Sequence, residues 1–349
     1  MNSSSNFRWI RTATVAGLLT SITCGCYLAD SARGQLALMS KRKPITRVLA
    51  NPATPPALRA QLGEVNSIRD FASRELLLPD NGSYRGYADL GRPYVVWNVV
   101  AAPEFSVDAR QWCYPIVGCV AYRGYFAEHK ARAFAAGLRA RGFDVSVDGV
   151  AAYSTLGHFD DPILNTMLSW SDVEFAAIIF HELSHQLLYV PGDAPFNEAL
   201  ATTIEEEGVR RWLLAHGREA DLTEHVREQA HYRQVIDLLR RTRTELSTLY
   251  ASGLGEVPMR ERKKAEFDVM REAFAALDRQ WGGAPFESWF KGDLNNAHLA
   301  SIATYYDCVP GFQRELESVH GNFKAFYQRV RELAVLDQAA RDAAVCARL

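Results

Sequence analysis

The stretch 171–190 reads SDVEFAAIIFHELSHQLLYV and combines a helix start signal with an apolar run. Ser171, followed three residues later by Glu174, forms a capping box, in which the two side chains bond free N–H groups at a helix start. Residues 175–180 are apolar almost all round, so the predicted helix is buried. We expect it to end before Pro191.

The same helix carries a metal-binding pattern. His181, Glu182 and His185 form the sequence H-E-x-x-H. Because residues four apart lie on one face of a helix, both imidazoles can bind one Zn²⁺. Glu182 projects a little way round the helix, from where it can take a proton from a zinc-bound water without binding the metal. Buried His and Glu are costly unless paired or bound to metal, which argues against a chance match.

Zinc needs a third protein ligand and an open fourth position. A second helix is predicted at about 195–215, and it carries Glu198 and Glu205 on nearly the same face. Small residues after Glu198 allow close packing against the first helix, so Glu198 is the predicted ligand. Glu205 is then expected to orient a histidine through its free N–H, and Glu205 as the ligand is the alternative.

The rest of the chain predicts an α+β fold. A β-rich run covers 94–100, an alternating segment covers 143–147, and an Ala-rich amphipathic helix lies between them at 126–141. Two long charged segments, 221–248 and 257–280, predict an antiparallel helical hairpin. We expect a small mixed or antiparallel sheet and a single domain over 27–349, with an N-terminal mixed α/β part at 27–170, metal-binding helices at 171–217 and a helical part at 218–349.

Composition limits the classes of function. The chain has 349 residues and 48% hydrophobic content, which is ample for a sizeable core. Its formal net charge is −2, so bulk charge gives no reason to expect nucleic-acid binding.

Residues 1–26 have the features of a signal peptide. A positive start precedes an apolar run at 13–23 that is too short to span a bilayer. Cys26 follows a small residue, as at a bacterial lipoprotein cleavage site, and is the predicted lipidation site; Cys24 is the weaker candidate. Ordinary secretion with cleavage elsewhere is the alternative. These features predict a bacterial cell-envelope protein, periplasmic and in contact with the membrane through a lipid anchor at most.

Export exposes cysteines to an oxidising compartment. Cys113 and Cys119 enclose a turn-forming stretch and can close a small disulfide loop. Two buried free thiols are the alternative. Cys308 and Cys346 have no metal-type partner near them in the sequence.

The segment 197–205 reads NEALATTIE and resembles the second helix of gluzincins, a clan of H-E-x-x-H zincins. In that clan the Glu after Asn is the third zinc ligand, which favours Glu198. Twelve residues separate His185 from Glu198, fewer than in thermolysin. Gluzincins often use a downstream Tyr to stabilise the transition state, so the resemblance implies this role for Tyr305 or Tyr306, with simple aromatic packing as the alternative.

A closer resemblance is to a bacterial family of putative aminopeptidases, often lipoproteins. It implies a zincin-like fold and action on peptides from the amino end. The blocks that carry it are 112–119, 153–157, 181–190, 196–198, 205–208, 295–297 and 305–307. The resemblance to gluzincins implies that a strand at 153–157 lines the cleft, with an ordinary core strand as the alternative.

The predicted function is therefore zinc-dependent peptide hydrolysis with Glu182 as general base. A zinc endopeptidase acting on short peptides is the nearest alternative. A non-catalytic zinc-binding envelope lipoprotein is the alternative from another class, and the presence of Glu182 argues against it, since a structural zinc site has no use for a base. The oligomeric state is not predicted.

Overall fold

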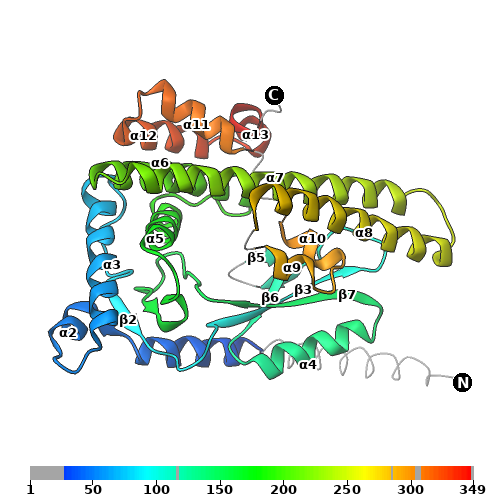
Figure 1. Cartoon of the computed structure of the whole chain (residues 1–349), viewed down its shortest axis with the longest axis horizontal. Coiled ribbons are helices and arrows are strands. Elements are labelled where there is room, and N and C mark those ends of the chain that lie inside the picture. Colours follow the sequence, from blue (N-terminus) through cyan, green and yellow to red (C-terminus); the bar gives the residue numbers. More distant parts are fainter. Residues whose placement is uncertain (1–26, 115–117, 284–285, 303–307, 347–349) are drawn as a thin grey trace, which may run out of the picture.

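Helices form most of the structure, and three small sheets complete an α+β architecture (Figure 1). The computed structural model describes residues 27–114, 118–283, 286–302 and 308–346. The predicted signal peptide, Cys24 and Cys26, and the tyrosines Tyr305 and Tyr306, lie outside the described residues. No helix in the described ranges combines the length and the apolar character needed to cross a membrane.

Residues 27–40 are helical and precede the first short strand. The further helices are α2 (Ile45–Ala50), α3 (Pro56–Arg74), α4 (Glu128–Arg139), a 3₁₀ turn (Asn165–Met167), α5 (Asp172–Leu187), α6 (Ala194–Ala215), α7 (Glu219–Tyr250), α8 (Glu256–Trp281), α9 (Glu287–Phe290), α10 (Asn296–Ile302), α11 (Val309–Ser318), α12 (Phe323–Ala334) and α13 (Gln338–Val345). The strands are β1 (Lys43–Pro44), β2 (Gly86–Ala88), β3 (Val96–Pro103), β4 (Trp112–Tyr114), β5 (Gly118–Val120), β6 (Tyr122–Tyr125), β7 (Phe143–Val150) and β8 (Ile163–Leu164).

Helix α5 is the buried helix that its sequence predicts. The capping box is confirmed: the Ser171 hydroxyl accepts a hydrogen bond from the Glu174 N–H, and the Glu174 carboxylate accepts one from the Ser171 N–H. Its apolar side chains enter the main core between α3 and α6. The most deeply buried of them are Phe175, Ile179, Phe180 and Leu183.

Helix α6 packs closely along α5. The Asp193 side chain caps α6 by accepting a hydrogen bond from the Phe196 N–H. A Cβ added at Gly208 would lie 2.8 Å from the Phe180 ring, so glycine permits this approach of the two helices. Asn197 fixes the linker between them, since its amide group makes two 2.8 Å hydrogen bonds with the backbone of Val190.

The largest sheet has the strand order β6-β3-β7 and is antiparallel. Helices α4 and α10 both contact it, and α4 lies on the side away from α7 in Figure 1. A second sheet, β1-β2-β8, is mixed, and β4 and β5 form a hairpin. In this hairpin Cys113 is paired with Cys119 in a disulfide.

The prediction of a strand at 153–157 is wrong. This segment is irregular, and Leu156 and Gly157 have positive φ values of 53° and 81°. The buried Asp161 carboxylate accepts hydrogen bonds from the Thr155 N–H, at 2.8 Å, and from its hydroxyl. Local side-chain bonds to the backbone compete with strand pairing, which explains why this segment forms a turn.

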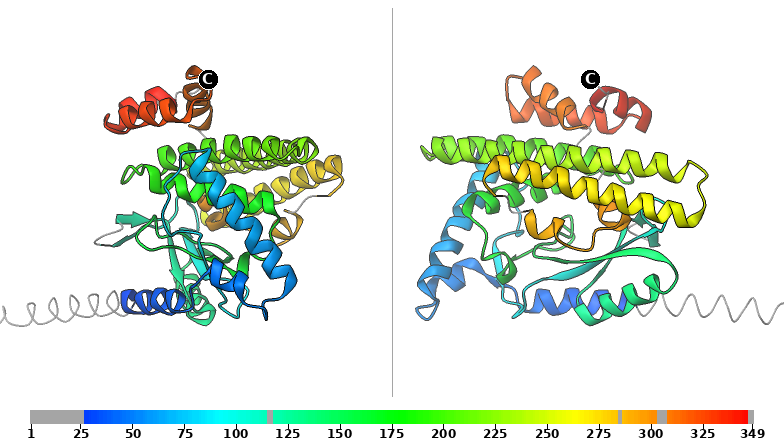
Figure 2. Two further views of the ribbon diagram at one scale, coloured as in Figure 1. Left: turned by 90° about the vertical axis from the view of Figure 1, so that its left-hand side faces the viewer. Right: turned by 45° about the vertical axis from the view of Figure 1, so that its right-hand side comes forward.

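The two long charged segments form α7 and α8, which pack together and extend to one side of the molecule (Figure 2). On the opposite side of α6 from α5, α11, α12 and α13 form a layer. A disulfide between Cys308 and Cys346 joins the start of α11 to the end of α13. This pair was not predicted, because the two cysteines are 38 positions apart and no local pattern relates them.

A buried ion pair anchors this layer to the start of α6. The Arg341 guanidinium lies 2.7 Å from the Asp193 carboxylate, and the two side chains are 10% and 2% exposed. Asp193 is also the cap of α6, so α13 neutralises the charge that the cap places inside the protein. Removing one member of a buried ion pair leaves the other charge without compensation.

We predict that Arg341→Ala lowers the free energy of unfolding by about 3–5 kcal/mol, because Asp193 would remain buried and unpaired. Urea unfolding followed by circular dichroism measures this change. Arg329→Ala is the matched control: Arg329 is 52% exposed in its pair with Glu315, so a loss below about 1 kcal/mol is expected. Equal losses for the two variants would contradict the prediction.

Candidate metal centre

Three side chains converge where α5 faces α6. The Nε2 atoms of His181 and His185 lie 3.2 Å apart, with their rings nearly perpendicular. Glu198 of α6 places one carboxylate oxygen 3.3 Å from His181 Nε2 and the other 3.7 Å from His185 Nε2. The structure thus brings together the three residues that the sequence predicts as metal ligands, and their donor atoms could hold a metal ion.

The spacing of these atoms fits a tetrahedral ion. Ligands at about 2.0–2.1 Å in a tetrahedron, as in zinc sites, lie about 3.3–3.4 Å from each other. The observed separations of 3.2, 3.3 and 3.7 Å are close to this value. Two imidazole nitrogens cannot both point lone pairs at each other, so this contact requires either a proton or a cation between them.

Glu205 lies behind His181, about two turns further along α6 than Glu198. Its carboxylate is 2.9 Å from His181 Nδ1. A carboxylate can only accept, so Nδ1 carries the proton and Nε2 keeps its lone pair for the metal side. In the described part of the chain His185 Nδ1 has no such partner. The structure therefore places Glu198 among the donor atoms and Glu205 behind one of them.

The electrostatics of the cluster also favour positive charge. Burial lowers the pKa of His181, but hydrogen bonds to Glu198 and Glu205 outweigh it and raise the pKa to about 10. Burial raises the pKa of Glu198, and the two histidines outweigh that effect and lower it to about 2. Both shifts have one cause: the charged imidazole and the carboxylates stabilise each other through hydrogen bonds and opposite charge.

Glu182 lies on a different face of α5, about 100° round the helix from His181. It lines a cavity of about 10 Å³ together with Tyr84 and Tyr153 and several apolar side chains. Burial, and then the charges of Glu182 and Asp161, raise the pKa of the Tyr84 hydroxyl. Tyr84 and Asp161 were not predicted as neighbours of Glu182, because nothing in their local sequence relates them to a helix about 100 and about 20 residues further along the chain.

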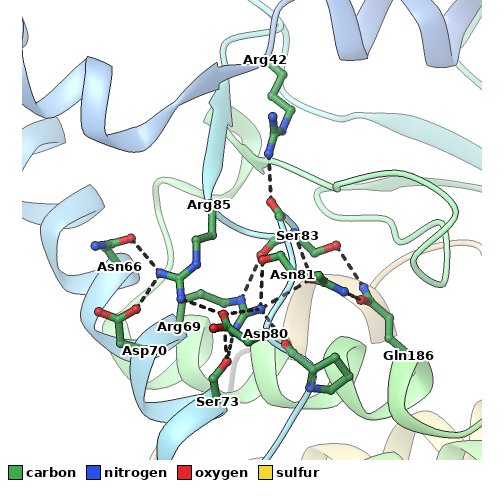
Figure 3. Close-up of polar contacts among 12 residues, drawn as sticks. Arg42, Asn66, Arg69, Asp70, Ser73, Asp80, Asn81, Ser83, Arg85 and Gln186 are labelled. Carbon is green, nitrogen blue, oxygen red and sulfur yellow. Dashed lines mark hydrogen bonds and ion pairs between the residues drawn. The ribbon is translucent and has the colours of Figure 1, made fainter.

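A polar network joins α5 to the loop before β2 (Figure 3). Arg69 of α3 is fully buried and donates to the backbone carbonyls of Pro79, Asn81 and Ser83. Gln186, one residue after His185, exchanges side-chain hydrogen bonds with Asn81, at 2.7 Å, and Ser83, at 3.3 Å. Because Glu182 and Gln186 are four residues apart, the loop meets the same face of α5 that carries Glu182.

Two tyrosines lie at the other side of the centre. The Tyr189 ring is 6.3 Å from the His185 ring, and 47% of the residue is exposed. Tyr122, on the edge strand β6, is 46% exposed. Partial burial raises the pKa of the Tyr122 hydroxyl, and so do the charges of Tyr27, Glu198, Tyr189 and Glu182. The predicted donors Tyr305 and Tyr306 remain outside the described residues.

Residues 26–345 match the sequence family described as "Putative aminopeptidase". The match covers more than nine tenths of the chain, and the protein belongs to this family. Neither the curated proteins nor the solved structures contain a significant match.

The ligand set can be tested by metal affinity. Glu198→Gln is expected to weaken the binding of added zinc more than about 100-fold, because a predicted ligand is lost. Glu205→Gln is expected to weaken it about 10- to 100-fold, because only the orientation of His181 is lost. Titration against a competing chelator measures both, with Glu207→Gln, whose carboxylate pairs with Arg210 and Arg211, as control. A larger loss for Glu205→Gln would make Glu205 the ligand.

The raised pKa of Asp161 predicts that the free energy of unfolding depends on pH. Burial raises its pKa from 3.8 to about 6, against the hydrogen bonds from Thr155. The folded state therefore binds the proton more tightly, and this stabilisation is present below pH 4 and is lost as pH rises through 6. Two pKa units correspond to about 3 kcal/mol.

Asp161→Asn should therefore flatten the profile of unfolding free energy between pH 4 and 7, measured by urea unfolding relative to wild type. Asp160→Asn, whose side chain is 53% exposed, is the control. A wild-type and an Asp161→Asn profile that run parallel would contradict the assignment.

Proposed function

We propose that this member of the aminopeptidase family is a zinc-dependent metallopeptidase of the gluzincin type, with a zincin-like fold. The observation that carries the proposal is the convergence of His181, His185 and Glu198 at separations that fit a tetrahedral ion, with Glu182 on the adjacent face of α5. A structural zinc site has four protein ligands, whereas three converge among the described residues, and this leaves a coordination position open.

His181, His185 and Glu198 would hold the ion, and Glu205 would keep the His181 ring oriented through Nδ1. A bound Zn²⁺ lowers the pKa of a coordinated water to about 7 and polarises a carbonyl oxygen. The Glu182 carboxylate takes the proton of the attacking water and then delivers it to the amine nitrogen that leaves. A phenol completes this scheme by donating to the developing oxyanion, a role proposed for Tyr305 or Tyr306.

The family supports action on peptides from the amino terminus. An endopeptidase acting on short peptides is the alternative, and the two differ in how they treat a blocked substrate. A non-catalytic zinc-binding envelope lipoprotein is the alternative from another class. A lipid anchor at Cys26 and a periplasmic location remain part of the proposal and rest on the sequence of residues 1–26 alone.

We predict that Glu182→Gln retains zinc at one ion per chain and loses at least about 10³-fold in kcat, because the amide cannot take a proton. Metal analysis and peptide hydrolysis on the same sample measure both quantities. Glu206→Gln, a carboxylate on α6 that pairs with Arg233, is the control for a change of charge near the centre. Equal hydrolysis by Glu182→Gln and wild type would end the enzyme proposal.

Product mapping separates the two kinds of peptidase. A panel of peptides with free and with N-acetylated amino termini is digested, and the products are identified by mass spectrometry. An aminopeptidase releases single residues from the free peptides only. Internal cleavage of both sets would favour the endopeptidase.

A further inference from the structure

Two residues with unfavourable backbone conformations lie in the loops that pack on the face of α5 that carries Glu182. Among the described non-glycine residues, four have positive φ: Leu77, Tyr84, Leu156 and His320. Positive φ is unfavourable for a bulky side chain and persists only where the surroundings enforce it. Two of the four, Tyr84 at 61° and Leu156 at 53°, belong to the loops that pack beside Glu182.

Asp161 joins these two loops. Its backbone carbonyl accepts a 2.6 Å hydrogen bond from the Tyr84 N–H, while its carboxylate binds the N–H and hydroxyl of Thr155. A Cβ at Gly157 would lie 3.3 Å from Gln186, so the second loop also touches α5. The turn of each loop is thus fixed by contacts from the other loop or from α5.

Arg69 holds the first loop from the other side (Figure 3). Its guanidinium donates to three carbonyls of the segment 79–83, at 2.7, 3.2 and 3.0 Å. Burial lowers the pKa of Arg69 only to about 10, so it stays charged at neutral pH and keeps its donors. The loop ends at Tyr84, whose side chain is only 3% exposed.

The buried Tyr84 ring limits the space beside Glu182. Tyr84 and Glu182 line the same cavity, which at about 10 Å³ has room for one water at most. Little free volume therefore remains between the Tyr84 ring and Glu182. If the Tyr84 ring were absent, a space of side-chain size would open directly beside the carboxylate.

We propose that Tyr84 is a positioning residue for Glu182: held at positive φ by Arg69 and Asp161, its ring blocks the rear of the cavity and keeps the Glu182 carboxylate directed toward the metal centre. This inference rests on the proposed function, in which Glu182 is the base. In this inference the Tyr84 ring matters and its hydroxyl does not, because the volume of the ring keeps the carboxylate out of the cavity.

The test compares Tyr84→Phe, Tyr84→Leu and Tyr84→Ala with wild type. We expect kcat to stay within about threefold for Phe, to fall for Leu and to fall about 10²-fold for Ala, as for a misplaced catalytic group. KM should change less than threefold, and zinc should remain at one ion per chain, because the ligands lie on the other face of α5. If Tyr84→Ala does not fold, the other two variants still test the inference, because the kcat of Tyr84→Phe should exceed that of Tyr84→Leu.

Leu77→Gly is the matched control. Leu77 also has positive φ, at 56°, but its side chain is 47% exposed and lines no cavity with Glu182. Relief of strain at this position should raise thermal stability and leave kcat unchanged.

A crystal structure of metal-free Tyr84→Ala gives a readout that does not depend on activity. We expect the Glu182 carboxylate to occupy the space that the ring vacates. An unmoved carboxylate, equal kcat values for the Phe, Leu and Ala variants, or loss of zinc by Tyr84→Ala would each overturn the inference. If wild type itself hydrolyses no peptide, the proposed function fails. The crystal structure of Tyr84→Ala would still show whether the Tyr84 ring determines the position of the Glu182 carboxylate.

Discussion

The contact between α5 and α6 is the constraint on which the centre depends. His181 and His185 reach a common point because four residues make about one helical turn, but Glu198 reaches it only if α6 lies close. Glycine at position 208 and the small residues around Glu198 permit that approach, and Asn197 holds the linker at the required length. Any movement of α6 along α5 would separate the three donor groups.

The charge buried at this contact has to be compensated. Glu198 and Glu205 place two carboxylates beside two imidazoles in a partly buried space, an arrangement that is costly without a proton or a cation. The start of the same helix presents a similar problem, since its cap Asp193 is buried, and there Arg341 of α13 supplies the positive charge. The C-terminal layer therefore stabilises the helix that delivers Glu198.

Helix α5 presents two functional faces to different neighbours. The histidine face meets α6, and the face of Glu182 and Gln186 meets the loops at 79–84 and 154–161. These loops are irregular, and their conformation depends on Arg69 and Asp161, which are remote from each other in sequence. The two predicted histidine ligands and the separately supported proposed base are thus combined on one helix.

The sequence determined the features that depend on neighbours along the chain. The capping box, the burial of α5 and the placement of His181, Glu182 and His185 follow from helical periodicity and local hydrogen bonding. The two helices of the hairpin are visible for the same reason. By contrast, the strand at 153–157 was expected from the family resemblance, and the local sequence contains no information about the hydrogen bonds that Asp161 makes with this segment.

Only the tertiary structure decided which carboxylate stands among the donor atoms, which residues surround Glu182, and how Cys308 finds Cys346. These outcomes depend on the distance between helices and on side chains that are up to about a hundred residues apart. Such distances are set by the packing of the whole core, in which each contact contributes little and the sum selects the arrangement.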